Sequence, residues 1–295
     1  MKNNFNTNDG TSNKPYLRVD INYNTCSDLP SFSKGPKGDD LLKHKAIAQA
    51  GFGGIQDGIP QLCQDLNLNL TAHARVNQIG DLKDLLPVWK SNNYNCATVH
   101  LGWGIESDYQ CNALVDYILN TSVNYDFPIY IETHRATVTQ DMFRTVALIE
   151  RFPEIRFNAD FSHWYTGQEM VYGGIEMKWK FLEPLFDRVR FLHGRIGNPG
   201  CIQVAIKNRG QAEFIEHFKE MWIRSFLGFL KSAKPGDYIV FTVELLSSQI
   251  YYAQTLMDAK GNLIEDGDRW EEALHYKSIA ESCWEEAQNR FNVLQ

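Results

Sequence analysis

The chain has 295 residues, of which 29 are Lys or Arg and 36 are Asp or Glu, so its formal net charge is −7. Hydrophobic residues make up 43% and charged residues 22%. This composition supplies one large core and excludes an intrinsically disordered chain. The acidic balance argues against a protein that binds nucleic acid through a general basic surface.

The sequence shows no pattern typical of export or membrane insertion. Its first residues are polar and rich in Asn, and no apolar run approaches the roughly 20 residues that cross a bilayer. The six cysteines contain no Cys-x-x-Cys pair, as expected for reduced, buried thiols. We therefore expect a soluble cytoplasmic protein whose partner is a small molecule, with neither nucleic acid nor a membrane as a partner.

Residues 1–14 predict a flexible tail, because they carry too little apolar surface to pack. Residues 15–295 then form one domain, in which short apolar stretches typical of strands alternate with segments of helical periodicity. The expected strands lie at 16–22, 53–57, 68–76, 95–103, 128–134, 155–161, 189–196 and 238–246. The expected helices lie within 39–51, 81–93, 111–123, 139–153, 176–189, 211–233 and 268–294.

Strand–helix alternation with crossovers of this length predicts parallel strands, and eight such units close most naturally into a single (β/α)8 TIM barrel of the α/β class. An open doubly wound sheet is the alternative, but no Gly-x-Gly-x-x-Gly follows the first strand. The extra helix at 268–294 is amphipathic, and its apolar residues should cover the barrel exterior or a partner subunit, so a homo-oligomer is compatible. These residues are Trp270, Leu274, Ile279 and Trp284.

Five of the eight histidines fall at or just beyond the end of an expected strand. They are His73, His100, His134, His163 and His193. The C-terminal strand ends of a parallel barrel form one rim, which is where its active sites are built. A single strand-end histidine is usually structural, but five at one rim indicate a site.

Acidic residues join the same rim. Because side chains alternate between the two faces of a strand, Glu132 shares a face with Tyr130 and His134, and the opposite face is apolar. The same alternation applies in the next three strands. Helices cover the outside of a barrel, so the polar faces should point inward. The residues expected to converge are Glu132, Asp160, His193 and Glu244.

Three carboxylates and one imidazole form a hard, oxygen-rich ligand set that suits Mn²⁺, Mg²⁺ or Co²⁺. Without a cation, three carboxylates in an interior would repel one another and take up protons. The alternative is a structural network in which some of them pair with Arg135, Arg156 or Arg195. We expect one divalent ion, with Mn²⁺ first and Mg²⁺, Co²⁺ or Zn²⁺ as alternatives.

The sequences Ile-Glu-Thr-His-Arg, Asn-Ala-Asp-Phe-Ser-His-Trp, Phe-Leu-His-Gly-Arg and Phe-Thr-Val-Glu-Leu-Leu occur in this order. This order resembles the xylose isomerase-like TIM-barrel superfamily, and most of all its branch of sugar isomerases and ketose 3-epimerases. The resemblance implies that Glu132, Asp160, His193 and Glu244 bind one divalent ion. It also implies that Glu132 and Glu244 shuttle protons, and that His163 and Arg195 hydrogen-bond to substrate oxygens.

The chemistry also follows from the residue types. Loss of a proton next to a carbonyl gives an enediolate, which a divalent ion stabilises and positioned carboxylates can reprotonate. The sequence thus predicts a metal-dependent isomerase or epimerase acting on a small carbohydrate, such as a ketose, sugar acid or keto-sugar derivative. If the intermediate instead expels a hydroxyl group, the enzyme is a sugar or polyol dehydratase.

Further rim residues are candidates for substrate binding. Trp103 and Trp164 offer faces for a sugar ring, and Arg135 with Arg195 could bind a carboxylate or phosphate. The imidazoles expected to bind hydroxyl groups are His73, His100 and His134. Two other readings stay open: a phosphoesterase like endonuclease IV, which holds three zinc ions in the same barrel, and a barrel that binds a polyol without turnover.

Overall fold

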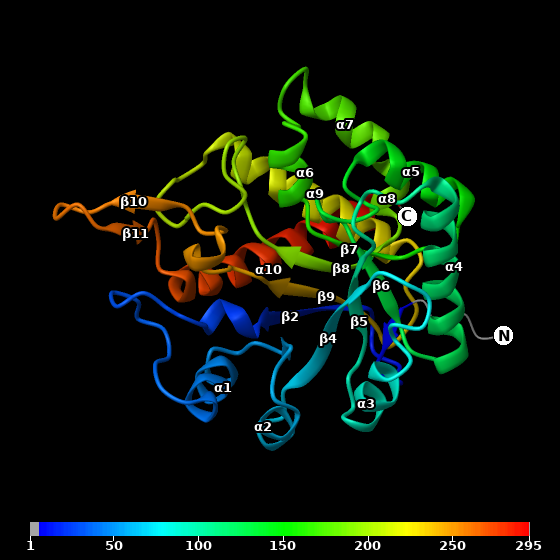
Figure 1. Ribbon diagram of the computed structural model, residues 1–295, viewed down its shortest axis with the longest axis horizontal. Helices are drawn as coiled ribbons and strands as arrows, with labels where there is room; N and C mark the ends of the chain where they lie inside the picture. Colours follow the sequence, from blue (N-terminus) through cyan, green and yellow to red (C-terminus); the bar gives the residue numbers. More distant parts are fainter. Residues whose placement is uncertain (1–5, 295) are drawn as a thin grey trace.

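The computed structural model describes residues 6–294 and contains a closed barrel of eight parallel strands (Figure 1). Consecutive strands are neighbours around the barrel, and the last strand pairs in parallel with the first, so the sheet has no free edge. The barrel strands are β2 (Tyr16–Asn22), β3 (Gly54–Gln56), β4 (Asn69–Val76), β5 (Ala97–Leu101), β6 (Ile129–Glu132), β7 (Phe157–Ala159), β8 (Val189–Gly194) and β9 (Asp237–Val243). The TIM-barrel prediction is confirmed, and each expected strand overlaps one of these eight.

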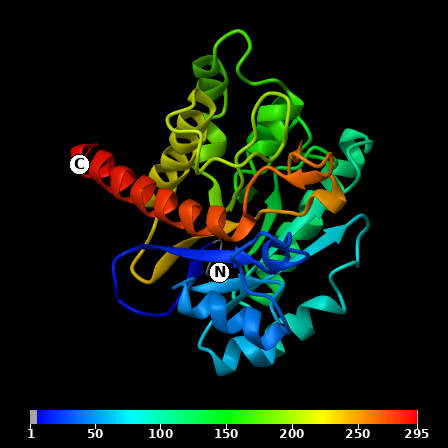
Figure 2. The ribbon, with the colours of Figure 1, turned by 90° about the vertical axis from the view of Figure 1, so that its left-hand side faces the viewer.

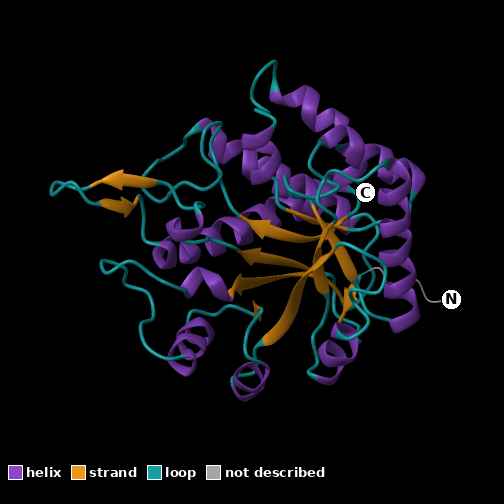
Figure 3. Ribbon diagram, in the orientation of Figure 1, coloured by secondary structure: helices purple, strands orange, loops and turns teal. Residues whose placement is uncertain are grey.

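Helices surround the strands on the outside, as Figure 3 shows. Several begin at side chains that accept a backbone hydrogen bond from the first turn, as Asp39, Ser107 and Asp141 do. The α-helices are α1 (Asp40–Gln49), α2 (Pro60–Asp65), α3 (Leu85–Ser91), α4 (Asp108–Tyr125), α5 (Met142–Arg151), α6 (Ser162–Gly167), α7 (Ile175–Phe181), α8 (Glu183–Phe186), α9 (Glu213–Leu230) and α10 (Arg269–Leu294). Two 3₁₀ turns, η1 (Tyr23–Cys26) and η2 (Ser248–Ile250), follow β2 and β9. None of the described helices is long and apolar enough to span a bilayer.

Two apolar clusters form the core. The larger lies between the barrel and its helices, and the smaller consists of Cys96, Tyr130, Phe191, Tyr238 and Val240. Members of the smaller cluster lie two residues away from polar residues of the predicted inner faces, and so on the same face of the strand, as Tyr130 and Glu132 do. The polar faces therefore point into the barrel.

The N-terminal segment is attached to the barrel over part of its length. Strand β1 (Thr7–Asn8) pairs antiparallel with β9, and the Asn8 amide donates to Asp237 Oδ1 at 2.7 Å. The prediction of a flexible tail over 1–14 rested on a lack of apolar residues, but polar side chains hold residues 7 and 8 through hydrogen bonds. Residues 1–5 lie outside the described part of the chain.

The C-terminal helix packs within the chain, along the barrel wall (Figure 2). The Trp284 ring on α10 meets Phe226 of α9 edge-on, with 5.6 Å between the ring centroids. The Tyr276 hydroxyl accepts a hydrogen bond from the backbone N–H of Ile196. A two-stranded hairpin, β10 (Thr255–Met257) and β11 (Leu263–Glu265), projects between β9 and α10; the sequence did not predict it.

Candidate metal centre

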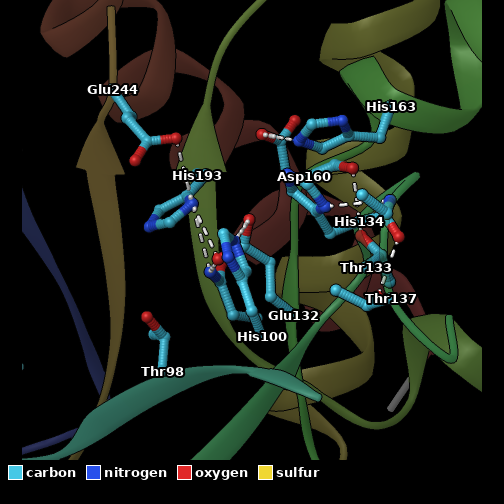
Figure 4. A network of polar contacts seen from close by, with 12 residues as sticks. Thr98, His100, Glu132, Thr133, His134, Thr137, Asp160, His163, His193 and Glu244 are labelled. Atoms are coloured by element: carbon cyan, nitrogen blue, oxygen red, sulfur yellow. Dashed lines mark hydrogen bonds and ion pairs between the residues drawn. The ribbon is translucent and has the colours of Figure 1, made fainter. Parts of the chain in front are cut away.

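The acidic side chains and His193 meet at the C-terminal end of the barrel. β6 ends at Glu132, Asp160 directly follows β7, His193 lies in β8, and Glu244 directly follows β9. His193 Nδ1 lies 3.3 Å from Glu244 Oε2 and 3.4 Å from Glu132 Oε2 (Figure 4). Ligand atoms offered by Glu132, Asp160 and His193 all lie within 4.8 Å of one another. The structure thus brings together the four side chains that the alternation of strand residues predicts to converge.

Arg195 lies among these carboxylates and is buried, as Glu132 and Asp160 are. Its Nη2 is 3.0 Å from Asp160 Oδ2 and also forms an ion pair with Glu244. Asp160 Oδ1 accepts hydrogen bonds from the backbone N–H of Ser162 at 3.0 Å and from its hydroxyl at 2.6 Å. The expected pairing of carboxylates with arginine therefore occurs for two of the three acidic residues.

The cluster carries an excess of negative charge. Burial alone lowers the pKa of His193, but the carboxylates of Glu244 and Glu132 outweigh burial and raise that pKa to about 9. Burial raises the pKa of Asp160, and Arg195 offsets this only in part. Three carboxylates thus face one guanidinium and one imidazole that they keep protonated, so the buried cluster stays net negative, which is costly in an interior. A divalent cation would balance it.

Unpaired buried atoms occur at the same place. Nε and Nη1 of Arg195, Oδ1 of Asn158 and both ring nitrogens of His163 form no hydrogen bond with any described residue. Buried polar atoms without partners are costly, and at a functional site they point to a missing ligand. The unpaired N–H groups of Arg195 suit an oxygen-bearing ligand, whereas the hard, oxygen-rich set of carboxylates with His193 fits a divalent cation. The side chains that would hold the ion are Glu132, Asp160, His193 and Glu244.

The other four strand-end imidazoles lie in a row beside this cluster. Ring centroids are 4.4 Å apart between His73 and His100, 4.1 Å between His100 and His134, and 3.9 Å between His134 and His163. Burial lowers the pKa of His73 to about 4 and that of His134 to about 3, and holds that of His163 well below its usual value. These three rings are therefore neutral at pH 7, and each presents one N–H.

Two members of the row are engaged with the protein itself. His134 Nδ1 accepts a hydrogen bond from the backbone N–H of Ala136 at 3.0 Å, so its proton resides on Nε2. His100 Nε2 lies 3.0 Å from Glu132 Oε1 and holds that carboxylate in place. Both rings serve as hydrogen-bond donors toward the site, whereas a many-histidine zinc cluster needs rings that offer lone pairs.

Arginines and aromatic rings lie around the cluster. The Arg75 guanidinium lies 4.4 Å from the ring centroid of Trp103, which is 55% exposed. Tyr252, in the loop after β9, has the guanidinium of Arg195 at 4.5 Å and that of Arg135 at 5.6 Å. Sequence analysis missed Tyr252, because no strand or helix pattern places that loop against the barrel.

Trp164 does not lie on the rim. Its side chain is fully buried in the main core, and its indole Nε1 donates to the carbonyl oxygen of Thr139 at 2.8 Å. The helical turn of α6 directs it away from Asp160, although it follows the strand end closely in sequence.

Four buried polar residues of the barrel interior were not predicted as part of the site. Asn158 donates to Glu132 Oε2 at 3.0 Å, and the others form a hydrogen-bonded group beneath His193. They are Asn22, Gln56 and Thr98. Asn22 and Gln56 are the last residues of β2 and β3, so the alternation applied to the four later strands would have found them.

Comparisons with known proteins address the fold. A xylose isomerase-like TIM-barrel protein from Mycobacterium smegmatis, solved in complex with magnesium, is 11% identical, covers 91% of this chain and 97% of its own, and superposes with a TM-score of 0.53. The chain therefore shares the TIM-barrel fold of this protein.

Weaker similarities extend to other barrels. The probable 3-DHS dehydratase AsbF from Bacillus anthracis is 13% identical, covers 79% of this chain and 94% of its own, and has a TM-score of 0.49. A xylanase from Cellvibrio japonicus is 9% identical, covers 90% of this chain and 98% of its own, and has a TM-score of 0.44. No protein-family model matches the chain, and no curated protein matches it by sequence.

Proposed function

We propose that the protein is a divalent-metal-dependent isomerase or epimerase of a small carbohydrate. The observation that carries the proposal is the convergence of Glu132, Asp160, His193 and Glu244 at the C-terminal ends of four consecutive barrel strands. The fold supports it, because TIM-barrel enzymes build their active sites at this end.

A divalent ion held by these four side chains, Mn²⁺ first and Mg²⁺, Co²⁺ or Zn²⁺ as alternatives, would supply Lewis-acid polarisation of a substrate carbonyl. Two of the four, Glu132 and Glu244, are suited to move protons. Each lies within 3.4 Å of His193 Nδ1, so the two carboxylates flank one point. One can remove a proton next to the carbonyl, and the other can return it at a different face or carbon.

Neighbouring side chains fix the orientation of both carboxylates, Glu132 and Glu244, through polar contacts. Glu132 Oε1 lies 3.0 Å from His100 Nε2, and Asn158 donates to its Oε2. Glu244 accepts a hydrogen bond from the Asn22 amide at 3.2 Å and pairs with Arg195. Carboxylates fixed in this way need little reorganisation when the proton moves.

The rim supports a substrate rich in oxygen. Neutral His134 and His163 present N–H groups to hydroxyls, and exposed Arg135 adds a positive charge. The exposed ring of Trp103 offers a face for the C–H side of a sugar. We place His100 and Arg195 behind these groups, where they contact Glu132 and Glu244, and His73 packs against His100.

Dehydration of a keto-polyol is the second candidate. A departing hydroxyl needs a hydrogen-bond donor, and both ring nitrogens of His163 lack a hydrogen-bond partner among the described residues, although one lies 3.4 Å from Asp160 Oδ2. The first step, proton removal by a carboxylate, is common to both reactions. The second step differs, because the proton returns to carbon in one and water leaves in the other.

The test is incubation of the Mn²⁺-loaded protein in deuterated water with a panel of ketopentoses, ketohexoses, sugar acids and keto-polyols, followed by proton NMR and mass spectrometry. We expect deuterium next to the carbonyl of one substrate, and a product with the same elemental formula. A product lighter by one water assigns the dehydratase instead. No deuterium exchange with any panel member, before or after chelation and reloading, would contradict both candidates.

A further inference from the structure

A group of buried amides lies directly beneath the candidate metal centre. We propose that Gln56 is a positioning residue that determines which ring nitrogen of His193 is available to the cation, with Asn22 fixing the orientation of Gln56. The proposal rests on the metal site of the proposed function, and it concerns residues of β2 and β3 that contribute no ligand themselves.

The contact between Gln56 and His193 is direct and buried. His193 Nε2 lies 2.9 Å from Gln56 Oε1, and both side chains are at most 1% exposed. On its other side, Gln56 Nε2 donates to Thr98 Oγ1 at 3.0 Å. Gln56 is therefore held at both ends of its amide group.

The direction of the hydrogen bonds follows from a backbone group. The backbone N–H of Asn24 donates to Asn22 Oδ1 at 2.9 Å, and a backbone N–H can only donate. The Asn22 amide nitrogen therefore faces the other way, toward Gln56 Oε1 at 3.0 Å. Turning Gln56 over would place two amide nitrogens face to face, and the buried hydrogen bond between Asn22 and Gln56 would be lost.

This fixed direction sets the tautomer of His193. Because Gln56 Oε1 only accepts, His193 Nε2 must keep its hydrogen, and Nδ1 is the ring nitrogen whose proton a cation would displace. Nδ1 is also the nitrogen that lies within 3.4 Å of both Glu132 and Glu244. The hydrogen bond to Gln56 and the positions of the two carboxylates thus both indicate Nδ1 as the metal-binding nitrogen.

Asn22 also reaches a second ligand. Its amide nitrogen lies 3.2 Å from Glu244 Oε1, in addition to its contact with Gln56. Asn22 and Gln56 thus position two of the four ligands, His193 and Glu244, from the neighbouring strands β2 and β3. Polar partners behind a metal ligand typically change metal affinity by roughly 10- to 100-fold when removed.

The test compares Mn²⁺ affinity, measured from the free-ion EPR signal during titration, in the wild-type protein and three variants. Gln56→Met keeps the side-chain volume and removes the acceptor; we expect a roughly 10- to 100-fold weaker affinity. Gln56→Glu keeps an acceptor for Nε2 and adds a negative charge nearby, so its affinity for Mn²⁺ should be no weaker than that of wild type. Thr98→Val breaks the amide contact on the side away from His193 and should stay within about threefold of wild type.

Thermal unfolding of the metal-free variants separates positioning from stability. If Gln56→Met and Thr98→Val lose similar stability but only Gln56→Met loses Mn²⁺ affinity, the proposal holds. Equal affinity of Gln56→Met and wild type would overturn it and leave the proposed function intact. If wild type itself binds no Mn²⁺, both fail. Should Gln56→Met not fold, Asn22→Ala carries the same expectation of weaker Mn²⁺ binding, and its retention of full affinity would overturn the proposal.

Discussion

Buried charges are balanced at one end of the barrel interior and unbalanced at the other. Toward the N-terminal ends of the strands, Arg18 donates to Asp20 through Nε and Nη2 and to Asn95 through Nη1. Its guanidinium also lies 4.8 Å from the centroid of the Tyr238 ring. Here one cation meets one anion, and the hydrogen-bonding groups of the pair have partners.

At the C-terminal ends, two of three carboxylates pair with one guanidinium, Arg195, and buried nitrogens lack partners. A balanced, satisfied pair is what a stable core needs, whereas an unbalanced cluster persists because it serves another purpose. Charge balance and hydrogen-bond satisfaction therefore separate the structural end from the functional end. Mutations at the two ends should have opposite consequences.

The largest expected effect is on catalysis at the unbalanced end. Glu244→Gln removes a proton-transferring carboxylate, so deuterium exchange into the substrate should fall about 10²- to 10⁴-fold. The free energy of unfolding of the metal-free protein should stay within about 1 kcal/mol of wild type or rise, because excess negative charge is removed. Glu176→Gln, on an exposed helix position, is the control. Near-normal exchange by Glu244→Gln would refute the two-carboxylate scheme.

At the balanced end the effect is on folding. Asp20→Ala leaves the Arg18 charge buried without its partner and should lower the free energy of unfolding by about 3–5 kcal/mol, measured by urea denaturation. Replacing both residues, as Arg18→Met with Asp20→Leu, should recover most of this loss. A double variant as unstable as Asp20→Ala would show that the pair does more than neutralise charge.

A bound cation should stabilise the folded protein, because it would balance the negative charge at the C-terminal end of the barrel. At Mn²⁺ about 100-fold above its dissociation constant, the free energy of unfolding should rise by about 2.7 kcal/mol, seen as a higher Tm that a chelator reverses. The Asp20→Ala variant should gain as much as wild type, because its defect lies at the other end. If Mn²⁺ does not change the Tm of the wild-type protein, the proposed metal site is wrong.

The smallest expected effect concerns the link between α10 and the loop after β8. Tyr276→Phe leaves the buried N–H of Ile196 without its acceptor and should cost about 1–2 kcal/mol of unfolding free energy. Tyr251→Phe is the matched control, because Tyr251 is 91% exposed. Equal stability of the two variants would mean that Ile196 finds another partner.

The sequence predicted the barrel because each of its eight strands is a short apolar run, and helical periodicity separates most of them. It also placed Glu132, Asp160, His193 and Glu244 on one inner face, because the two-residue period of a strand fixes the face of each side chain. The structure brings these four together. The bound ion and the reaction stay predictions.

Residues that depend on three-dimensional context were harder to predict. Gln56 and Asn22 look like ordinary polar residues until closure of the barrel brings β2 and β3 next to β9 and β8. Tyr252 lies in a loop whose path no periodicity determines. Trp164 follows a strand end closely, yet the turn of α6 buries it. Residues 7 and 8 are held by side-chain hydrogen bonds that composition does not reveal.

The most direct test of the central claim is elemental analysis of the purified protein after reloading with Mn²⁺ and dialysis. We predict about one divalent ion per chain in wild type and in His275→Ala, a histidine variant on α10, and none in His193→Ala. No ion in wild type, retention of the ion by His193→Ala, or two or three ions per chain would contradict a single metal centre built on Glu132, Asp160, His193 and Glu244.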